Sequence, residues 1–347
     1  MTGRQRFYNY IGGKCVDRVP NMNIAIHFAA KYADIPFGQF CTDYRKIVDA
    51  NLKTSEVFRF DVLNLMCDPY REVADFGGTF EYSDEDMPKY VQPLLQTRAD
   101  IGRLKPFDPF QAKRSLDRLE AIALAKKMAG DEYIIYGEID GPLAVSVLLR
   151  GMADFFMDML DEPGFVRDLF EIVTEVNIRT VKAQKQAGAE MIVMGEAAAS
   201  QISSQMYEEL VFEYDKRVVD AIIKEGMIPR LHICGNSTHL LECFPRLGVS
   251  IVDLDWMVDL DRALQVFDDD MFISGNLDPV GTYLEGDRQL VRWKVLELLN
   301  RKDRRIIVSS GCEIAENAPR ENVYEQYLTL RDHSGIVLGE PTEDTDK

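Results

Sequence analysis

The chain has 347 residues, of which 46% are hydrophobic and 28% are charged. This composition excludes a disordered chain, a collagen-like repeat and a small scaffold held by disulfides. The formal net charge of −18 repels phosphate backbones and anionic lipid surfaces, so we expect neither nucleic acid nor a membrane as a partner. No run approaches the roughly 18 apolar residues that a membrane helix requires, and residues 1–19 have no apolar core of the signal-peptide kind. These features predict a cytoplasmic protein.

Short apolar runs alternate with longer segments of helical period, which is typical of repeated β-α units. Strands buried on both faces are predicted at residues 19–26, 62–67, 133–139, 190–195, 228–233, 250–254, 271–274 and 305–309. Intervening helices are marked by start and stop residues at Ser115 and Gly130, Pro163 and Gly188, and Ser204 and Gly226. This pattern favours a single (β/α)8 barrel. The alternative is a doubly wound open sheet, but no G-x-G-x-x-G follows an early strand.

Two segments depart from the alternation. Residues 68–132 are too long for an ordinary connection, and they contain polar turn residues, so we predict an insertion over one mouth of the barrel. Residues 339–347 are acidic and have little to bury, so we predict a disordered tail. Residues 1–338 form the single predicted domain.

Polar residues gather where the predicted strands end. The active sites of β/α barrels form at the carboxyl ends of the strands. The polar residues at these positions include Asp68, Asp140, Glu196, His232, Cys234, Asn236, Asn276 and Cys312. Any one of them alone could be a solvated loop residue, a helix cap or a turn residue. Together they favour a functional site, in which an asparagine amide can both donate to and accept from a substrate.

His232, Cys234 and Cys312 are candidate metal ligands. Residues two apart on a strand point to the same face, so His232 and Cys234 are predicted to converge. Cys312 follows the last predicted strand and lies across the same mouth. Neutral imidazole and thiolate are preferred by zinc, and three protein ligands with an open position are typical of a catalytic zinc. The alternative is two buried thiols beside a hydrogen-bonded histidine.

Several stretches resemble the uroporphyrinogen decarboxylase superfamily, and its zinc-containing, corrinoid-dependent methyltransferase branch in particular. They are LHICGN at 231–236, SGNLDP at 274–279, SSGCEI at 309–314 and APREN at 318–322. The resemblance covers about the whole chain and implies a (β/α)8 barrel. Its most specific element is the H-x-C…C motif, which separates the methyltransferases from the decarboxylases.

The resemblance also assigns residues. Asp68 matches the carboxylate that the decarboxylases carry after the second strand, whereas Cys312 stands where they tend to have a histidine. Residues 21–27 lack the basic segment with which the decarboxylases hold substrate carboxylates. Glu196 matches an acidic residue of related methyltransferases. It is expected either to be the fourth zinc ligand or to be a polar group that lines the pocket. In the second case a solvent molecule completes the zinc coordination.

The resemblance implies methyl transfer between a corrinoid, such as methylcobalamin, and a small thiol, pterin or methyl ether. Nothing in the sequence resembles a cobalamin-binding domain, so the corrinoid is expected on a partner protein. We expect Asp68 and Glu196 to act in catalysis. We expect the substrate to be bound by Asp140, Asn236 and Asn276. Two alternatives are a tetrapyrrole decarboxylase without a cofactor and a non-catalytic barrel that binds a metal or a tetrapyrrole.

Overall fold

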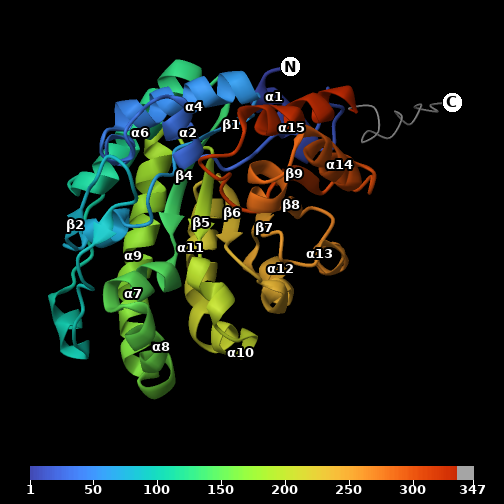
Figure 1. Ribbon diagram of the computed structural model, residues 1–347. Helices are drawn as coiled ribbons and strands as arrows, with labels where there is room; N and C mark the ends of the chain where they lie inside the picture. Colours follow the sequence, from blue (N-terminus) through green and yellow to red (C-terminus); the bar gives the residue numbers. More distant parts are fainter. Residues whose placement is uncertain (334–347) are drawn as a thin grey trace.

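Seven parallel strands form one curved sheet surrounded by helices (Figure 1). The computed structural model describes residues 1–333, so the predicted tail at 339–347 lies outside the described residues. The strands follow one another around the sheet as β1 (Val62–Asn64), β4 (Ile134–Asp140), β5 (Met191–Gly195), β6 (Ile228–Ile233), β7 (Ile251–Leu254), β8 (Phe272–Leu277) and β9 (Ile306–Ser310). This arrangement is a (β/α)8 barrel, as the sequence predicts, and each of these strands overlaps a predicted one.

The eighth predicted strand, at residues 19–26, is not a strand. The segment lies between β9 and β1, where the carbonyl of Asn21 accepts a hydrogen bond from the amide of Asp61 at 2.9 Å. On the other side, the amide of Ser310 donates to the side chain of Asn23 at 2.7 Å. Because side-chain amides replace part of the backbone ladder, the segment fills the eighth position of the wall without regular strand pairing.

Gln326 in the last helix, α15 (Arg320–Asp332), fastens this segment. Its Nε2 donates to Asn21 Oδ1 at 3.0 Å and to the carbonyl of Val308 at 2.9 Å. Its Oε1 accepts from Asn23 Nδ2 at 2.8 Å. Gln326 thus joins the 19–26 segment to β9, and all three amide side chains involved are buried.

Long helices alternate with the strands in the outer layer. They are α4 (Tyr44–Phe58), α6 (Lys113–Ala129), α9 (Pro163–Ala187), α11 (Phe212–Lys224), α14 (Arg288–Leu299) and α15. The bounds of helix α9 follow from residues that mark helix ends. Pro163 occupies its first turn, where a missing N–H costs nothing, and Gly188 ends it at φ 112°. The predicted helices beginning near Ser115 and Ser204 are also present.

Shorter elements complete the chain. The short α-helices are α1 (Gly3–Ile11), α2 (His27–Tyr32), α3 (Phe37–Thr42), α5 (Arg71–Asp75), α7 (Pro142–Arg150), α8 (Met152–Asp161), α10 (Ser204–Met206), α12 (Phe244–Leu247) and α13 (Leu260–Val266). The 3-10 and π turns are η1 (Arg98–Arg103), η2 (Ala197–Gln201), η3 (Tyr207–Val211), η4 (Thr238–Cys243) and η5 (Pro279–Leu284). Within residues 1–333, no helix combines the length and the apolar character needed to cross a bilayer.

The segment predicted as an insertion, 68–132, consists of two parts. Its end is α6, which packs against α4, α9 and β4 as an ordinary outer helix of the barrel. Residues 68–112 contain α5, η1 and the antiparallel pair β2 (Phe80–Glu81) and β3 (Lys89–Tyr90). The amide of Leu95 donates to the carbonyl of Leu149 at 2.9 Å, which ties this part to the end of α7.

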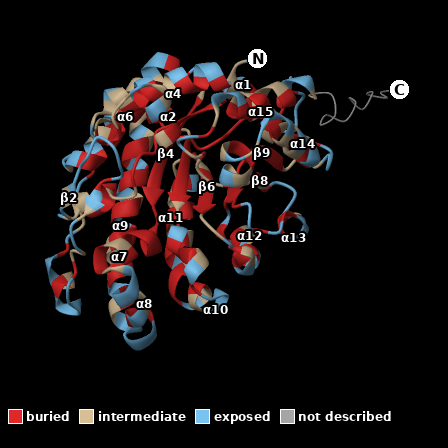
Figure 2. Ribbon diagram, in the orientation of Figure 1, coloured by how far each residue is buried: buried red, intermediate tan, exposed pale blue. Residues whose placement is uncertain are grey.

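The strands are buried on both faces, and the exposed residues lie on the outer surfaces of the helices (Figure 2). Polar residues are nevertheless abundant inside the barrel wall. They include Glu138 and Asp140 on β4, Arg230 and His232 on β6, and Asp253 on β7. A parallel sheet normally buries continuous apolar runs. These polar residues therefore make the barrel interior the candidate location of a functional site.

Candidate functional site

His232, Cys234 and Cys312 converge at the carboxyl ends of β6 and β9. Nε2 of His232 lies 3.2 Å from Sγ of Cys234 and 3.7 Å from Sγ of Cys312. The two sulfur atoms are 3.7 Å apart. One nitrogen and two sulfur atoms within 4.8 Å of one another form the donor set that zinc prefers. The residues at this site fit a zinc ion.

The imidazole of His232 is oriented from behind. Its Nδ1 lies 3.2 Å from Oδ2 of Asp253, on the neighbouring strand β7. Asp253 is held in turn by Arg230, whose Nε donates to both carboxylate oxygens at 2.9 and 3.0 Å. Burial alone would raise the pKa of Asp253, but the Arg230 guanidinium and His232 outweigh it and lower that pKa. An ionised Asp253 fixes Nδ1 as the protonated nitrogen and leaves Nε2 free to face the cysteines.

One of the two thiols is set up as a thiolate. The Cys234 thiol, as a donor, lowers the pKa of Cys312 against the effect of burial, and His232 lowers it further. Both cysteine side chains are partly exposed, unlike the buried strand residues beside them. A thiolate open to the mouth is the form that binds a metal ion.

Glu196 does not join this group. Its two carboxylate oxygens accept hydrogen bonds from the amides of Leu143 at 3.0 Å and Ala144 at 2.9 Å, in the first turn of α7. Another neighbour is Asp215 on α11. Burial first, and then the nearby Asp215 carboxyl group, raise the pKa of Glu196 well above its usual value. Glu196 directly follows Gly195, which ends β5, and it faces the outer helices because successive strand residues alternate between the two faces.

Asp68 is buried near the start of the connection that follows β1. It forms an ion pair with Arg114 of α6, and the thiol of Cys67 donates to it at 3.1 Å. Burial would raise the pKa of Asp68, but Arg114 and Arg71 hold it below its usual range. Cys41, Cys67 and Asp68 also lie within 4.8 Å of one another. Two guanidinium groups contact this second group and stabilise its ionised carboxylate. Their positive charge makes the group unsuited to a metal cation.

Asp140 ends β4 and faces the barrel interior. It is in register with Gly195 of β5, which is in register with His232 of β6. Burial first, then the carboxylates of Glu72 and Glu138, raise the pKa of Asp140 well above its usual value. Asp140 and His232 thus occupy one layer of the barrel, with Gly195 between them.

The two predicted asparagines make hydrogen bonds with backbone groups of nearby segments. Asn236 is exposed, and its Oδ1 accepts from the amide of Thr238 at 3.1 Å, which is the turn arrangement that the sequence also allowed. Asn276 donates from Nδ2 to the carbonyl of Val258 at 3.2 Å. Within residues 1–333, neither side chain makes a hydrogen bond to the cysteines or to His232.

Sequence reasoning did not assign Asp253, Arg230 or Arg114 to the site. Asp253 sits at the end of a predicted strand, so its position at the mouth could be read, but its pairing with His232 depends on strand register. Arg114 lies in α6, 46 residues after Asp68. No local signal indicates such a long-range ion pair.

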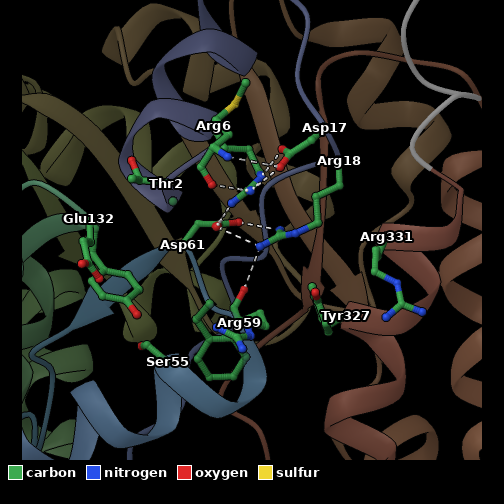
Figure 3. Close-up of a pocket in the computed structure, with 14 residues that line it drawn as sticks. Thr2, Arg6, Asp17, Arg18, Ser55, Arg59, Asp61, Glu132, Tyr327 and Arg331 are labelled. Atoms are coloured by element: carbon green, nitrogen blue, oxygen red, sulfur yellow. Dashed lines mark hydrogen bonds and ion pairs between the residues drawn. The ribbon is translucent and has the colours of Figure 1, made fainter.

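A polar cavity of about 340 Å³ lies at the opposite end of the barrel, where its lining includes residues that precede β1 and β4. Figure 3 shows the charged residues that line it. Arg6 and Arg18 both point to Asp61, which precedes β1, with nitrogen–oxygen distances of 2.6 and 2.7 Å. Arg6 also pairs with Asp17 at 2.6 Å. Residues at this end of a β/α barrel serve stability rather than catalysis, and these charges neutralise one another.

Comparison with known proteins places the chain in a family of enzymes. A family model described as uroporphyrinogen decarboxylase (URO-D) matches residues 2–331. The chain is 27% identical to the uroporphyrinogen decarboxylase of Carboxydothermus hydrogenoformans over 319 residues, covering 88% of this chain and 89% of that protein. It is 25% identical to the methylcobamide:CoM methyltransferase MtbA of Methanosarcina acetivorans over 328 residues, covering 93% and 95%.

A solved methyltransferase from Methanosarcina mazei has the same fold. Its TM-score is 0.86 at 21% identity, with 96% of this chain and 99% of that chain covered. The fold is that of an enzyme family whose similar members include both decarboxylases and methyltransferases. The chain belongs to the uroporphyrinogen decarboxylase family.

Proposed function

We propose that this protein is a zinc-dependent methyltransferase that moves a methyl group between a corrinoid and a small thiol, pterin or methyl ether. The observation that carries the proposal is the convergence of His232, Cys234 and Cys312 at the barrel mouth. A tetrapyrrole decarboxylase that works without a cofactor has no use for this donor set. The similarity to methylcobamide:CoM methyltransferases along nearly the whole chain supports the same function.

In this proposal each residue has a defined task. His232, Cys234 and Cys312 hold the zinc ion, which would lower the pKa of a bound thiol or withdraw electron density from an ether oxygen. Asp253 keeps the His232 ring in the orientation that presents Nε2. Asp140 faces the interior in the same layer and contacts the substrate. Asp68, buried and paired with Arg114, holds that guanidinium in place beside the site.

The corrinoid is proposed to arrive on a partner protein that docks at the mouth. Residues 68–112 pack beside α7 and form the proposed cover over this end of the barrel. The substrate would therefore meet the corrinoid in a space bounded by the strand ends and this segment. The cytoplasmic location remains a prediction from the sequence.

The proposal is tested by zinc analysis and methyl transfer on the same preparations. Wild-type protein purified without chelators should contain about one zinc per chain and should transfer methyl groups with methylcobalamin and at least one thiol, pterin or phenyl methyl ether. Cys312→Ala should lose both properties and stay folded, because an ion at the mouth does not close the core. Cys243→Ala is the matched control, since Cys243 lies in η4 and contacts Glu208 at 3.2 Å.

Two results would contradict the proposal. One is less than about a tenth of an equivalent of zinc in the wild-type protein, and the other is wild-type zinc content in Cys312→Ala. The decarboxylase alternative draws on the similarity to uroporphyrinogen decarboxylases. It requires carbon dioxide release from uroporphyrinogen that survives Cys234→Ala.

A further inference from the structure

Three neighbouring strands present one layer of residues to the barrel interior near the mouth. Asp140 of β4 pairs in register with Gly195 of β5, and Gly195 pairs with His232 of β6. His232 meets Cys312, which follows the non-adjacent strand β9, so this layer faces the barrel interior. Glu196, the next residue along β5, faces the helices outside. The middle position of the layer is therefore occupied by a residue without a side chain.

Gly195 is open to solvent although the residues around it are closed. Met194 and Glu196 are 1% and 0% exposed, whereas Gly195 is partly exposed. Adjacent strands lie about 4.8 Å apart, so the backbones of Asp140 and His232 are separated by about 10 Å. A side chain on Gly195 would fill this interval. Its absence leaves a gap between Asp140 and the metal-binding residues.

The carboxyl group of Asp140 borders the gap. A Cβ atom placed on Gly195 would lie 3.3 Å from Oδ1 of Asp140, so that oxygen is directly beside the glycine. Asp140 is 8% exposed, and among residues 1–333 no donor makes a hydrogen bond or ion pair with its carboxyl group. The side chain is nearly buried, yet its carboxyl oxygens still reach solvent and have no partner, so they are available to a ligand that enters the gap.

We propose that Gly195 forms the floor of a substrate subsite between Asp140 and the His232–Cys234–Cys312 group, and that the subsite takes a small molecule carrying a hydroxyl or amino group. The atom that exchanges the methyl group faces the cysteines, and the hydroxyl or amino group binds Asp140. Gly195 determines specificity by keeping the interval open. This inference rests on the proposed function and adds to it the class of substrate.

The surroundings of Asp140 agree with a substrate group of this class. Burial and the neighbouring carboxylates of Glu72 and Glu138 raise the pKa of Asp140, so its carboxyl group can both donate and accept a hydrogen bond. A hydroxyl group also does both, and an amino group gains from the negative charge nearby. A substrate carboxylate at this position would be repelled.

The experiment measures binding of matched probes to the zinc-containing protein by calorimetry. The pairs are 2-mercaptoethanol with ethanethiol, and 2-methoxyphenol with methoxybenzene, which differ only by the hydroxyl group. The wild-type protein should bind the hydroxylated member of at least one pair more tightly. Asp140→Leu should abolish that preference, and Asp140→Asn, which keeps hydrogen-bonding atoms, should retain part of it.

Gly195→Ala should weaken binding of the preferred probe about ten- to hundredfold, the range expected when one methyl group enters a fitted pocket. Gly195→Val should weaken it further. Gly164→Ala is the matched control, because Gly164 in α9 has open space around it. Zinc content and melting temperature should be unchanged in Gly195→Ala, which separates a filled subsite from a damaged fold.

Wild-type affinity in Gly195→Ala, or equal affinities for the members of both pairs, would overturn the inference. These failures differ from failure of the proposed function. If zinc is bound and Cys312→Ala abolishes methyl transfer, the proposed function stands and only the subsite is wrong. If the wild-type protein binds no zinc, the proposed function itself is wrong.

Discussion

Asp253 and His232, on adjacent strands, are joined through Oδ2 and Nδ1 at 3.2 Å, which directs the other imidazole nitrogen to Cys234 at the same distance. A carboxylate behind a metal-binding histidine typically contributes ten- to a hundredfold in metal affinity. The buried Arg230 keeps this carboxylate ionised and in place.

Asp253→Asn should therefore weaken zinc binding by about ten- to a hundredfold, because the amide is a poorer acceptor for the Nδ1 proton. The dissociation constant is measured by competition with a chromogenic chelator. Asp259→Asn, at the amino end of α13, serves as the control and should bind zinc like the wild type. Equal affinities in the two variants would remove Asp253 from any role in orienting the ligand.

Glu196→Gln should leave the zinc stoichiometry unchanged, because both Glu196 oxygens are used by the first turn of α7. The substitution puts an N–H donor against a backbone amide, so the free energy of unfolding should fall by about 1–3 kcal/mol. Elemental analysis and urea unfolding measure the two effects. A stable variant that has lost its zinc would restore Glu196 as a ligand.

Asp215 makes stability depend on pH. Burial raises its pKa to about 7, above the ordinary value of 3.8. The folded protein therefore keeps a proton that the unfolded chain releases between about pH 4 and pH 7, and stability falls as the pH rises through this window. One proton changes the free energy of unfolding by up to about 1.4 kcal/mol per pH unit.

Asp215→Asn should flatten this decline, since the amide can still accept from Tyr207, which now donates to Asp215 at 2.7 Å. Urea unfolding at several pH values between 4 and 8 provides the measurement. An unchanged slope in the variant would show that the proton resides elsewhere.

Asp61→Asn should lower the free energy of unfolding by about 3–5 kcal/mol, the cost of leaving buried charges without a partner. Asp61 is 1% exposed and pairs with both Arg6 and Arg18. Asp17→Asn removes a carboxylate whose side chain is 49% exposed, and it should cost at most about 1 kcal/mol. Zinc content should be normal in both variants. Similar losses from the two substitutions would contradict this distinction.

Most of the fold could be predicted from local sequence patterns. Seven strands and the long helices follow from apolar runs and from residues such as Pro163 and Gly188, whose effect extends over a few neighbours. The 19–26 segment was misread because its apolar residues suit a strand, whereas its hydrogen bonding is decided by Asn21, Asn23 and the distant Gln326.

The site was predictable where alternation along one strand was enough, as for His232 and Cys234. The prediction was weaker where a shift of one residue along a strand decides whether a side chain faces the barrel interior or the outer helices. Gly195 and Glu196 are adjacent, and only strand register shows that the glycine faces the interior and the carboxylate faces α7. Asn276 and Arg114 depend on contacts with distant segments, which a single sequence does not reveal.

Gln326 has a consequence for how the chain is made. The wall of the barrel is joined between its first and last parts, and the amide of Gln326 connects Asn21 near the start with Val308 near the end. When only the first 300 residues have been synthesised, the barrel wall is still open, and the backbone groups along its two edges have no hydrogen-bond partners. Closure must wait for almost complete synthesis, so premature termination before residue 326 should yield aggregating fragments rather than a smaller stable protein.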